Sequence, residues 1–182
     1  MIGNRFRILS GFAFGLFAVT PGIQSKDAGM FKFESSYKSV TALLDADTKT
    51  PLNADTFDEE LWLLLNRKID RPEDLKKYPD PVGIYFASRY VQWEVGNGGF
   101  TQAAENVPEW FEPAASGYQS LGKPKAAALI KKAISLLQTG DGESLEAQLE
   151  ALVEEIPTDE WWIDPARVEY VRNHRDAFEA VR

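Results

Sequence analysis

The sequence predicts an all-α fold, a compact single-domain multi-helix bundle of about seven helices. Apolar residues recur at helical spacing in successive segments, as Leu61, Trp62, Leu64 and Leu65 do within residues 55–67. No alternating run of apolar and polar residues is long enough to predict a strand. With 182 residues and a hydrophobic share of 44%, the chain is long enough to bury one core.

Three helical segments are expected in the first half of the domain, at residues 35–46, 55–67 and 81–96. The first two each carry an apolar stripe on one side. The third follows Asp80-Pro81, a pair typical of a helix start because proline fits the first turn. A proline-containing loop separates the second segment from the third.

The second half begins with a short segment at 100–106, followed by four longer amphipathic segments at 108–121, 124–138, 143–156 and 166–181. Glycine or proline stands at most of the boundaries, where it ends one helix or starts the next. These boundary residues are Gly122, Pro124, Gly140, Gly142 and Pro165.

The composition narrows the possible chemistry. The chain has no cysteine, so thiolate metal sites and thiol nucleophiles are excluded, and a histidine site would depend on the single residue His174. We therefore expect neither a metal nor another cofactor. The net charge of −8 disfavours direct contact with nucleic acid and favours a basic partner. No apolar run reaches the length of a membrane span.

The chain divides into an N-terminal extension, residues 1–29, and a helical domain, residues 30–182. Residues 1–25 have a short basic start and a diluted apolar stretch, the pattern of a weak signal peptide. Met30, the only other methionine, begins the domain-like sequence, so translation starting there is the alternative that we prefer. A start at Met30 predicts a cytoplasmic protein, whereas a signal peptide predicts export.

The most distinctive stretch is EVGNGGFTQAAEN, residues 94–106. It lacks the glycine pattern and the lysine of a phosphate-binding loop. A helix corner explains it better: Gly98 would take the left-handed conformation that ends one helix, and Gly99 would let the next helix start close by. The polar and aromatic residues around the glycines would complete the corner, and these are Glu94, Asn97, Phe100, Gln102 and Asn106.

The same residues match the signature E-x-x-N-G-G-F-x-Q-x-x-x-N, and the sequence thereby resembles a bacterial family of small acidic all-helical proteins. The similarity extends more diffusely over residues 55–182. The best-studied member of that family is a DNA mimic that occupies the DNA-binding surface of a transcription factor. The resemblance therefore implies an all-helical, DNA-mimic-like domain in residues 30–182 and a transcription factor as one possible class of partner.

A candidate acidic interaction face lies after the helix at 124–138. No basic residue occurs between Lys132 and Arg167, and nine acids fall between Asp141 and Asp164. We expect this face to contain Glu143, Glu146, Glu150, Glu154, Glu155, Asp159 and Glu160. Further acids that could add to it are Asp55, Asp58, Glu59 and Glu60, or Glu105, Glu109 and Glu112. An ordinary solvated helix face is an equally good interpretation of the same pattern.

The function expected from the sequence is a non-catalytic acidic interaction protein that binds a basic protein, and a homodimer is an open alternative for supplying enough charge. A second hypothesis places a small-molecule or enzymatic site at the corner formed by Glu94–Asn106. The sequence contains no nucleophile–base pair or metal-ligand spacing that would support catalysis.

The adjacent residues Trp161 and Trp162 are a further unusual feature. One ring could be exposed to a partner, or the two rings could fill gaps on opposite sides of a tight connection. We expect the second arrangement.

Overall fold

The structure is a computed structural model and describes residues 34–140 and 142–181. Within these ranges it contains nine α-helices, seven of them at least seven residues long, and no strand. The predicted all-α class is therefore confirmed. The extension expected at residues 1–29 lies outside the described residues.

The α-helices are α1 (Val40–Lys49), α2 (Ala54–Leu65), α3 (Asp80–Asn106), α4 (Phe111–Ser120), α5 (Pro124–Thr139), α6 (Gly142–Ala151), α7 (Thr158–Trp161), α8 (Asp164–Asn173) and α9 (Arg175–Glu179). Three short 3₁₀ helices accompany them, η1 (Pro72–Lys77), η2 (Pro108–Trp110) and η3 (Leu152–Glu155).

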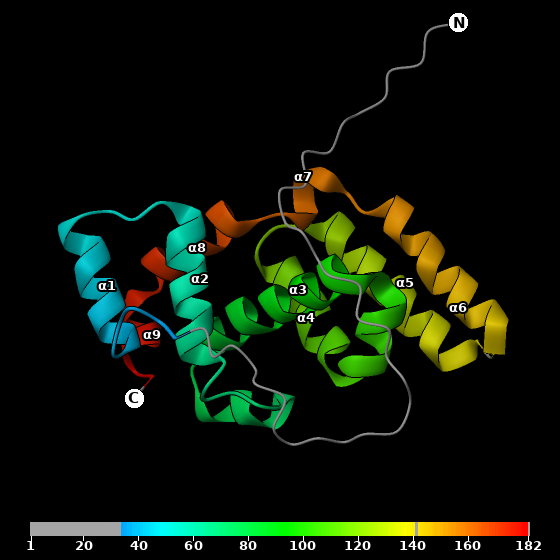
Figure 1. The fold of residues 1–182 in the computed structure, drawn as a ribbon, viewed down its shortest axis with the longest axis horizontal. Helices are drawn as coiled ribbons and strands as arrows, with labels where there is room; N and C mark the ends of the chain where they lie inside the picture. Colours follow the sequence, from blue (N-terminus) through cyan, green and yellow to red (C-terminus); the bar gives the residue numbers. More distant parts are fainter. Residues whose placement is uncertain (1–33, 141, 182) are drawn as a thin grey trace, which may run out of the picture. The chain divides into compact units, whose positions relative to one another are not determined.

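Helix α3 runs through the middle of the domain, and α2, α4, α6, α8 and α9 pack on it (Figure 1). The C-terminal helices α8 and α9 return to pack against α2 and α1, so segments far apart in sequence lie side by side. Helices α4, α5 and α6 form the other side of the domain, where α4 packs on both α3 and α5.

Local sequence explains several helix ends. The side chain of Ser39 accepts a hydrogen bond from the Ala42 amide at the start of α1, and Asn53 does the same for Thr56 in α2. Gly122 follows α4 with a φ of 71°, the left-handed conformation that favours glycine after a helix.

Several expected segments are subdivided. The segment 108–121 begins as η2 before α4, and 143–156 tightens into η3 after α6. The segment 166–181 breaks at His174, whose φ of −118° and ψ of 30° separate α8 from α9. A stretch expected to be loop forms η1, with a proline in its first turn.

Aromatic side chains form much of the core. Trp62 stacks on Phe86, with ring centroids 4.9 Å apart, and Trp110 packs on Phe86 at 5.2 Å. A second group forms where Trp161 stacks on Tyr118, with centroids 5.4 Å apart. Phe86, Trp110, Tyr118 and Trp161 are all at most 1% exposed, and burial of such rings is a major part of the stability of a domain.

Candidate functional site

The helix corner lies inside α3, where Gly98 has a φ of −158° and a ψ of 26°, and Gly99 has a φ of 74° and a ψ of −174°. The expectation that Gly98 takes the left-handed conformation is wrong, because its φ is negative. Gly99 has the positive φ instead, with a ψ of −174°, a region that is almost restricted to glycine. The extended φ of Gly98 is open to any residue, so its conformation does not require glycine. Within the corner, only Gly99 has a backbone conformation that favours glycine.

Close neighbours explain the absence of a side chain at both positions. A Cβ atom on Gly98 would lie 2.9 Å from the Cβ atom of Gln102 and closer still to its amide group. A Cβ atom on Gly99 would lie 3.2 Å from Cγ2 of Val153 in η3. The space beside each glycine is therefore filled by a side chain of the described chain, and the corner packs directly against η3.

The polar residues of the motif have different environments. Glu94 is 5% exposed, and its Oε2 accepts a hydrogen bond of 3.0 Å from Nδ2 of Asn106. This bond links the helical segments before and after the corner. Asn97 is exposed to solvent, and Phe100 is fully buried, with its ring centroid 5.6 Å from that of Trp161.

Two hollows among the described residues lie away from the corner. One of about 550 Å³ is lined by residues of η1, α3 and α4, including Leu75, Gly83 and Gly117. Another of about 360 Å³ lies at the α8–α9 junction, around His174. Neither has a residue of the 94–106 corner in its lining. No group of three or more potential metal ligands occurs in the described part of the chain.

Three of the predicted acids form a row on α6 and η3. Glu146, Glu150 and Glu154 are exposed, and none of them forms an ion pair with a basic side chain among the described residues. Glu143 lies one turn earlier in α6. We call Glu146, Glu150 and Glu154 the acidic row.

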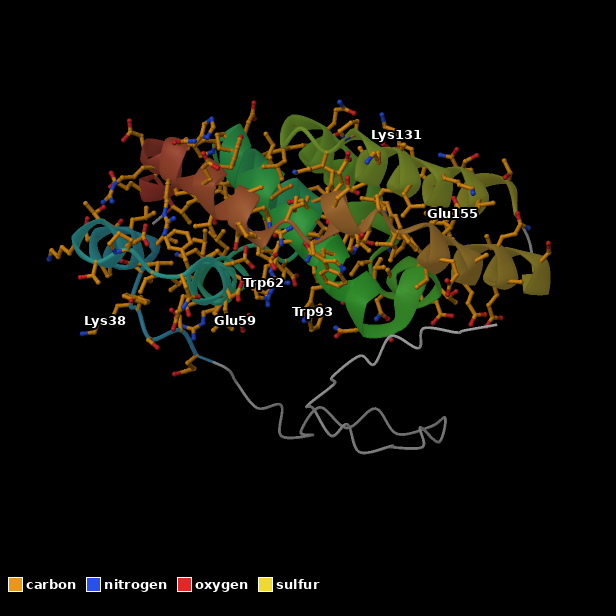
Figure 2. The ribbon with its side chains drawn as sticks, turned by 90° about the horizontal axis from the view of Figure 1, so that it is seen from above. Lys38, Glu59, Trp62, Trp93, Lys131 and Glu155 are labelled. Carbon is orange, nitrogen blue, oxygen red and sulfur yellow. The ribbon has the colours of Figure 1, made fainter. Side chains whose placement is uncertain are left out.

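The other three predicted acids contact lysines of α5. Oε1 of Glu155 lies 2.5 Å from Nζ of Lys132, and Figure 2 shows Glu155 between the ribbons of α6 and α5. Oδ2 of Asp159 lies 2.9 Å from Nζ of Lys125, and this hydrogen bond lowers the pKa of Asp159. Oε2 of Glu160 accepts a hydrogen bond of 2.6 Å from the Lys125 amide. These acids therefore connect α5 with the segment that follows α6.

Of the supplementary acids, Asp58 is not on the surface. It is 2% exposed, so the expectation that it adds to an acidic face is wrong. Glu60 accepts hydrogen bonds from Oγ of Ser35 and from the amide of Ser36. Glu59 is exposed, with its side chain 56% accessible.

Asp58 belongs to a buried polar network that the sequence analysis missed. Its Oδ2 accepts a hydrogen bond of 2.5 Å from Nε of Arg89, and its Oδ1 accepts one of 3.0 Å from the hydroxyl of Tyr85. Nε of Arg167 lies 3.4 Å from the same Oδ1. Burial alone would lower the pKa of Arg167, but Asp58 and other nearby groups raise it, so the guanidinium keeps its charge.

The network continues from Arg167 into α3 and α4. Nη1 of Arg167 donates a hydrogen bond of 2.6 Å to Oε1 of Gln92, and Nη2 donates to Asp164. The hydroxyl of Tyr118 on α4 lies 3.5 Å from the same Oε1 of Gln92 and also donates to the carbonyl of Trp161 at 3.1 Å. One sequence signal was available: Asp58 precedes Leu61 and Leu65 by three and seven residues, which places it on the apolar side of α2.

The tryptophan pair at 161–162 is divided between core and surface. Trp161 is fully buried, whereas Trp162 is 54% exposed. The expectation that both rings fill gaps is therefore wrong for Trp162. Trp93 on α3 and Val153 in η3 are also exposed, at 45% and 38%.

Comparison with known proteins identifies the family. The family model described as DMP19-like protein matches residues 76–180, more than half of the 182 residues. The match includes the glycine corner and the acidic row. No curated protein matches the chain, and no solved structure matches it. None of the described helices is long and apolar enough to cross a membrane. The chain belongs to the DMP19-like protein family, which includes the DNA-mimic protein DMP19.

Proposed function

We propose that this protein is a non-catalytic interaction protein, and that its acidic row binds the basic surface of a DNA-binding protein in place of DNA. The observation that carries the proposal is the exposure of Glu146, Glu150 and Glu154 without an ion pair to any described basic side chain. Membership of a family that includes a DNA mimic supports it.

The charge density of the row sets a requirement on the complex. Carboxylates four residues apart on a helix are spaced about 6 Å along the axis, whereas duplex DNA carries one charge per ~1.7 Å. The row therefore has roughly a quarter of the axial charge density of DNA. To match the charge of DNA, the surface needs more acids from this chain or from a second copy, and exposed Asp55, Glu105 and Glu112 are available as additional charges.

The physical signature of such binding is its dependence on salt. Exposed charges are screened over about 8 Å at physiological ionic strength, so an interface formed mainly by carboxylates and partner lysines or arginines weakens as salt is added. The net charge of −8 also accelerates association with a basic partner at low salt.

The test compares the wild type with a variant in which the acidic row is reversed, Glu146→Lys, Glu150→Lys and Glu154→Lys. The matched control is Glu73→Lys, Glu169→Lys and Asp176→Lys, which changes the net charge equally at exposed acids outside the row. Partners captured from the host are purified, and their affinities for this protein and for labelled duplex DNA are measured at 50 and 200 mM salt.

The proposal predicts a partner that binds duplex DNA by itself, and that this protein displaces from DNA. The reversed row should abolish the displacement, and the control should retain most of it. If every partner binds the reversed variant as tightly as the wild type, without sensitivity to salt, the proposal is wrong.

A further inference from the structure

Three exposed apolar side chains lie along one side of the C-terminal half of α3. They are Trp93, Val153 and Trp162, which are 45%, 38% and 54% exposed, and we call them the indole patch. Large aromatic side chains this exposed are uncommon on a protein surface and are enriched where partners bind. Figure 2 shows Trp93 on the outer side of α3.

The glycines of α3 bring these side chains together. The ring of Trp162 lies over Gly96, where an added Cβ atom would be 3.4 Å from its nearest carbon. Trp93 lies on the same helix, three residues before Gly96, and residues three apart are neighbours on a helix surface. Val153 lies over Gly99, three residues after Gly96. The patch therefore follows α3 from Trp93 to the glycine corner.

The indole patch adjoins the acidic row. Val153 is flanked in η3 by Glu154 and follows Glu150 by three residues. The side chain of Val153 contacts the corner, while both glutamates are exposed. The patch and the acidic row therefore adjoin at Val153.

The size and charge of the patch indicate what it binds. Two half-exposed indoles and one valine offer on the order of 300 Å² of apolar surface, since a whole aromatic side chain buries 150–250 Å². A stable protein interface needs about 800 Å² per partner. The patch is too small to hold a second copy alone, and the adjacent carboxylates of two copies would repel each other. A basic partner has the complementary charge.

We propose that the indole patch binds arginine side chains of the basic partner, whose charges are neutralised by the acidic row. This inference rests on the proposed function. A guanidinium is planar and weakly hydrated, so it stacks on an indole ring while its N–H groups donate to a carboxylate. A lysine ammonium is more strongly hydrated and gains less from the same surface. The patch therefore gives the acidic surface a preference for arginine over lysine.

The test uses two labelled peptides, nine arginines and nine lysines, titrated separately against the full-length protein while fluorescence anisotropy is measured. The variants are Trp93→Ala with Trp162→Ala, the reversed acidic row, and Tyr170→Ala as an aromatic control away from the patch. Circular dichroism checks that each variant is folded. Removal of two exposed side chains leaves the core aromatic residues in place.

The wild type should bind the arginine peptide more tightly than the lysine peptide. The double tryptophan variant should bind the arginine peptide about fivefold to thirtyfold more weakly, as expected for two cation–π contacts, and should lose the preference. Its affinity for the lysine peptide should change little, and Tyr170→Ala should behave like the wild type.

The two proposals fail in different ways. If the double tryptophan variant keeps the full arginine preference while the reversed row abolishes binding, the indole patch is not the arginine contact and the proposed function stands. If the reversed row binds both peptides as the wild type does, the proposed function is wrong. If the tryptophan variant only converts a dimer into a monomer in sedimentation, the patch joins two copies and the inference is overturned.

Discussion

Replacing Asp58 with asparagine tests whether the buried polar network stabilises the packing of α2 against α3 and α8. Asp58 on α2 contacts Arg89 on α3 and Arg167 on α8, and Arg167 is fully buried. The asparagine is nearly the same size, so the variant removes the negative charge and leaves packing almost unchanged. Two guanidinium groups then remain close together, without the carboxylate that lies between them.

The structure sets the expected magnitude. Removing one partner of a buried ion pair costs about 3–5 kcal/mol, since the remaining charge keeps its desolvation cost. In a domain of this size each kcal/mol lowers the melting temperature by about 2–4 °C, so we expect a decrease of roughly 6 to 20 °C. The adjacent Glu59 is the control: its side chain is 56% exposed and 3.5 Å from Arg89, so Glu59→Gln should cost at most about 1 kcal/mol.

Urea unfolding followed by tryptophan fluorescence and circular dichroism measures both variants. A second variant, Arg167→Met, and the double variant complete a thermodynamic cycle. Removing both charges should cost less than the sum of the single losses, because Asp58 and Arg167 interact directly. A loss below 1 kcal/mol for Asp58→Asn, or strict additivity in the cycle, would refute the role assigned to the network.

Two further predictions concern the corner and the C-terminal helices. Gly99→Ala should lower the free energy of unfolding by about 1–3 kcal/mol, because alanine rarely adopts a φ of 74° with a ψ of −174°. Gly96→Ala should not destabilise the protein, and equal losses in urea unfolding would contradict this prediction. Burial raises the pKa of Asp47, but hydrogen bonds from Arg172 and from the Leu52 amide outweigh it and hold the pKa below its usual 3.8. The ionised Asp47 therefore stabilises the fold above pH 3.8, and this stabilisation is lost as the pH falls through the lower pKa of the folded state. The difference in free energy of unfolding between the wild type and Asp47→Asn should shrink below about pH 4. A difference that does not change with pH would refute this prediction.

The sequence predicted the helices well because their apolar spacing is a local property. The all-α class and most segment ranges follow from this periodicity and from glycine and proline at the boundaries. The boundaries that differ depend on smaller local effects, such as the break at His174 and the tightening of the chain in η3. Periodicity does not resolve those effects.

The candidate site was harder to predict because it depends on contacts between distant segments. Asp58 and Arg167 are 109 residues apart in the sequence, so no local sequence pattern predicts that they pair. The same limitation applies to the acids after Ala151: Glu155 and Asp159 carry the same charge as the acidic row, but only the packing of α5 shows that lysines contact them. Sequence spacing identified the acids without showing which of them are paired.

The glycine corner connects the fold with the proposed binding surface. Gly96 lies under Trp162, and Gly99 lies under Val153, so these two glycines of the 94–106 stretch set how closely the two side chains approach α3. A side chain at position 99 would have to displace η3, which carries Glu154. Such a change would shift the acidic row relative to the indoles without removing any residue of the proposed interface. The motif would therefore affect partner binding by positioning the surface, and the corner itself needs no contact with the partner.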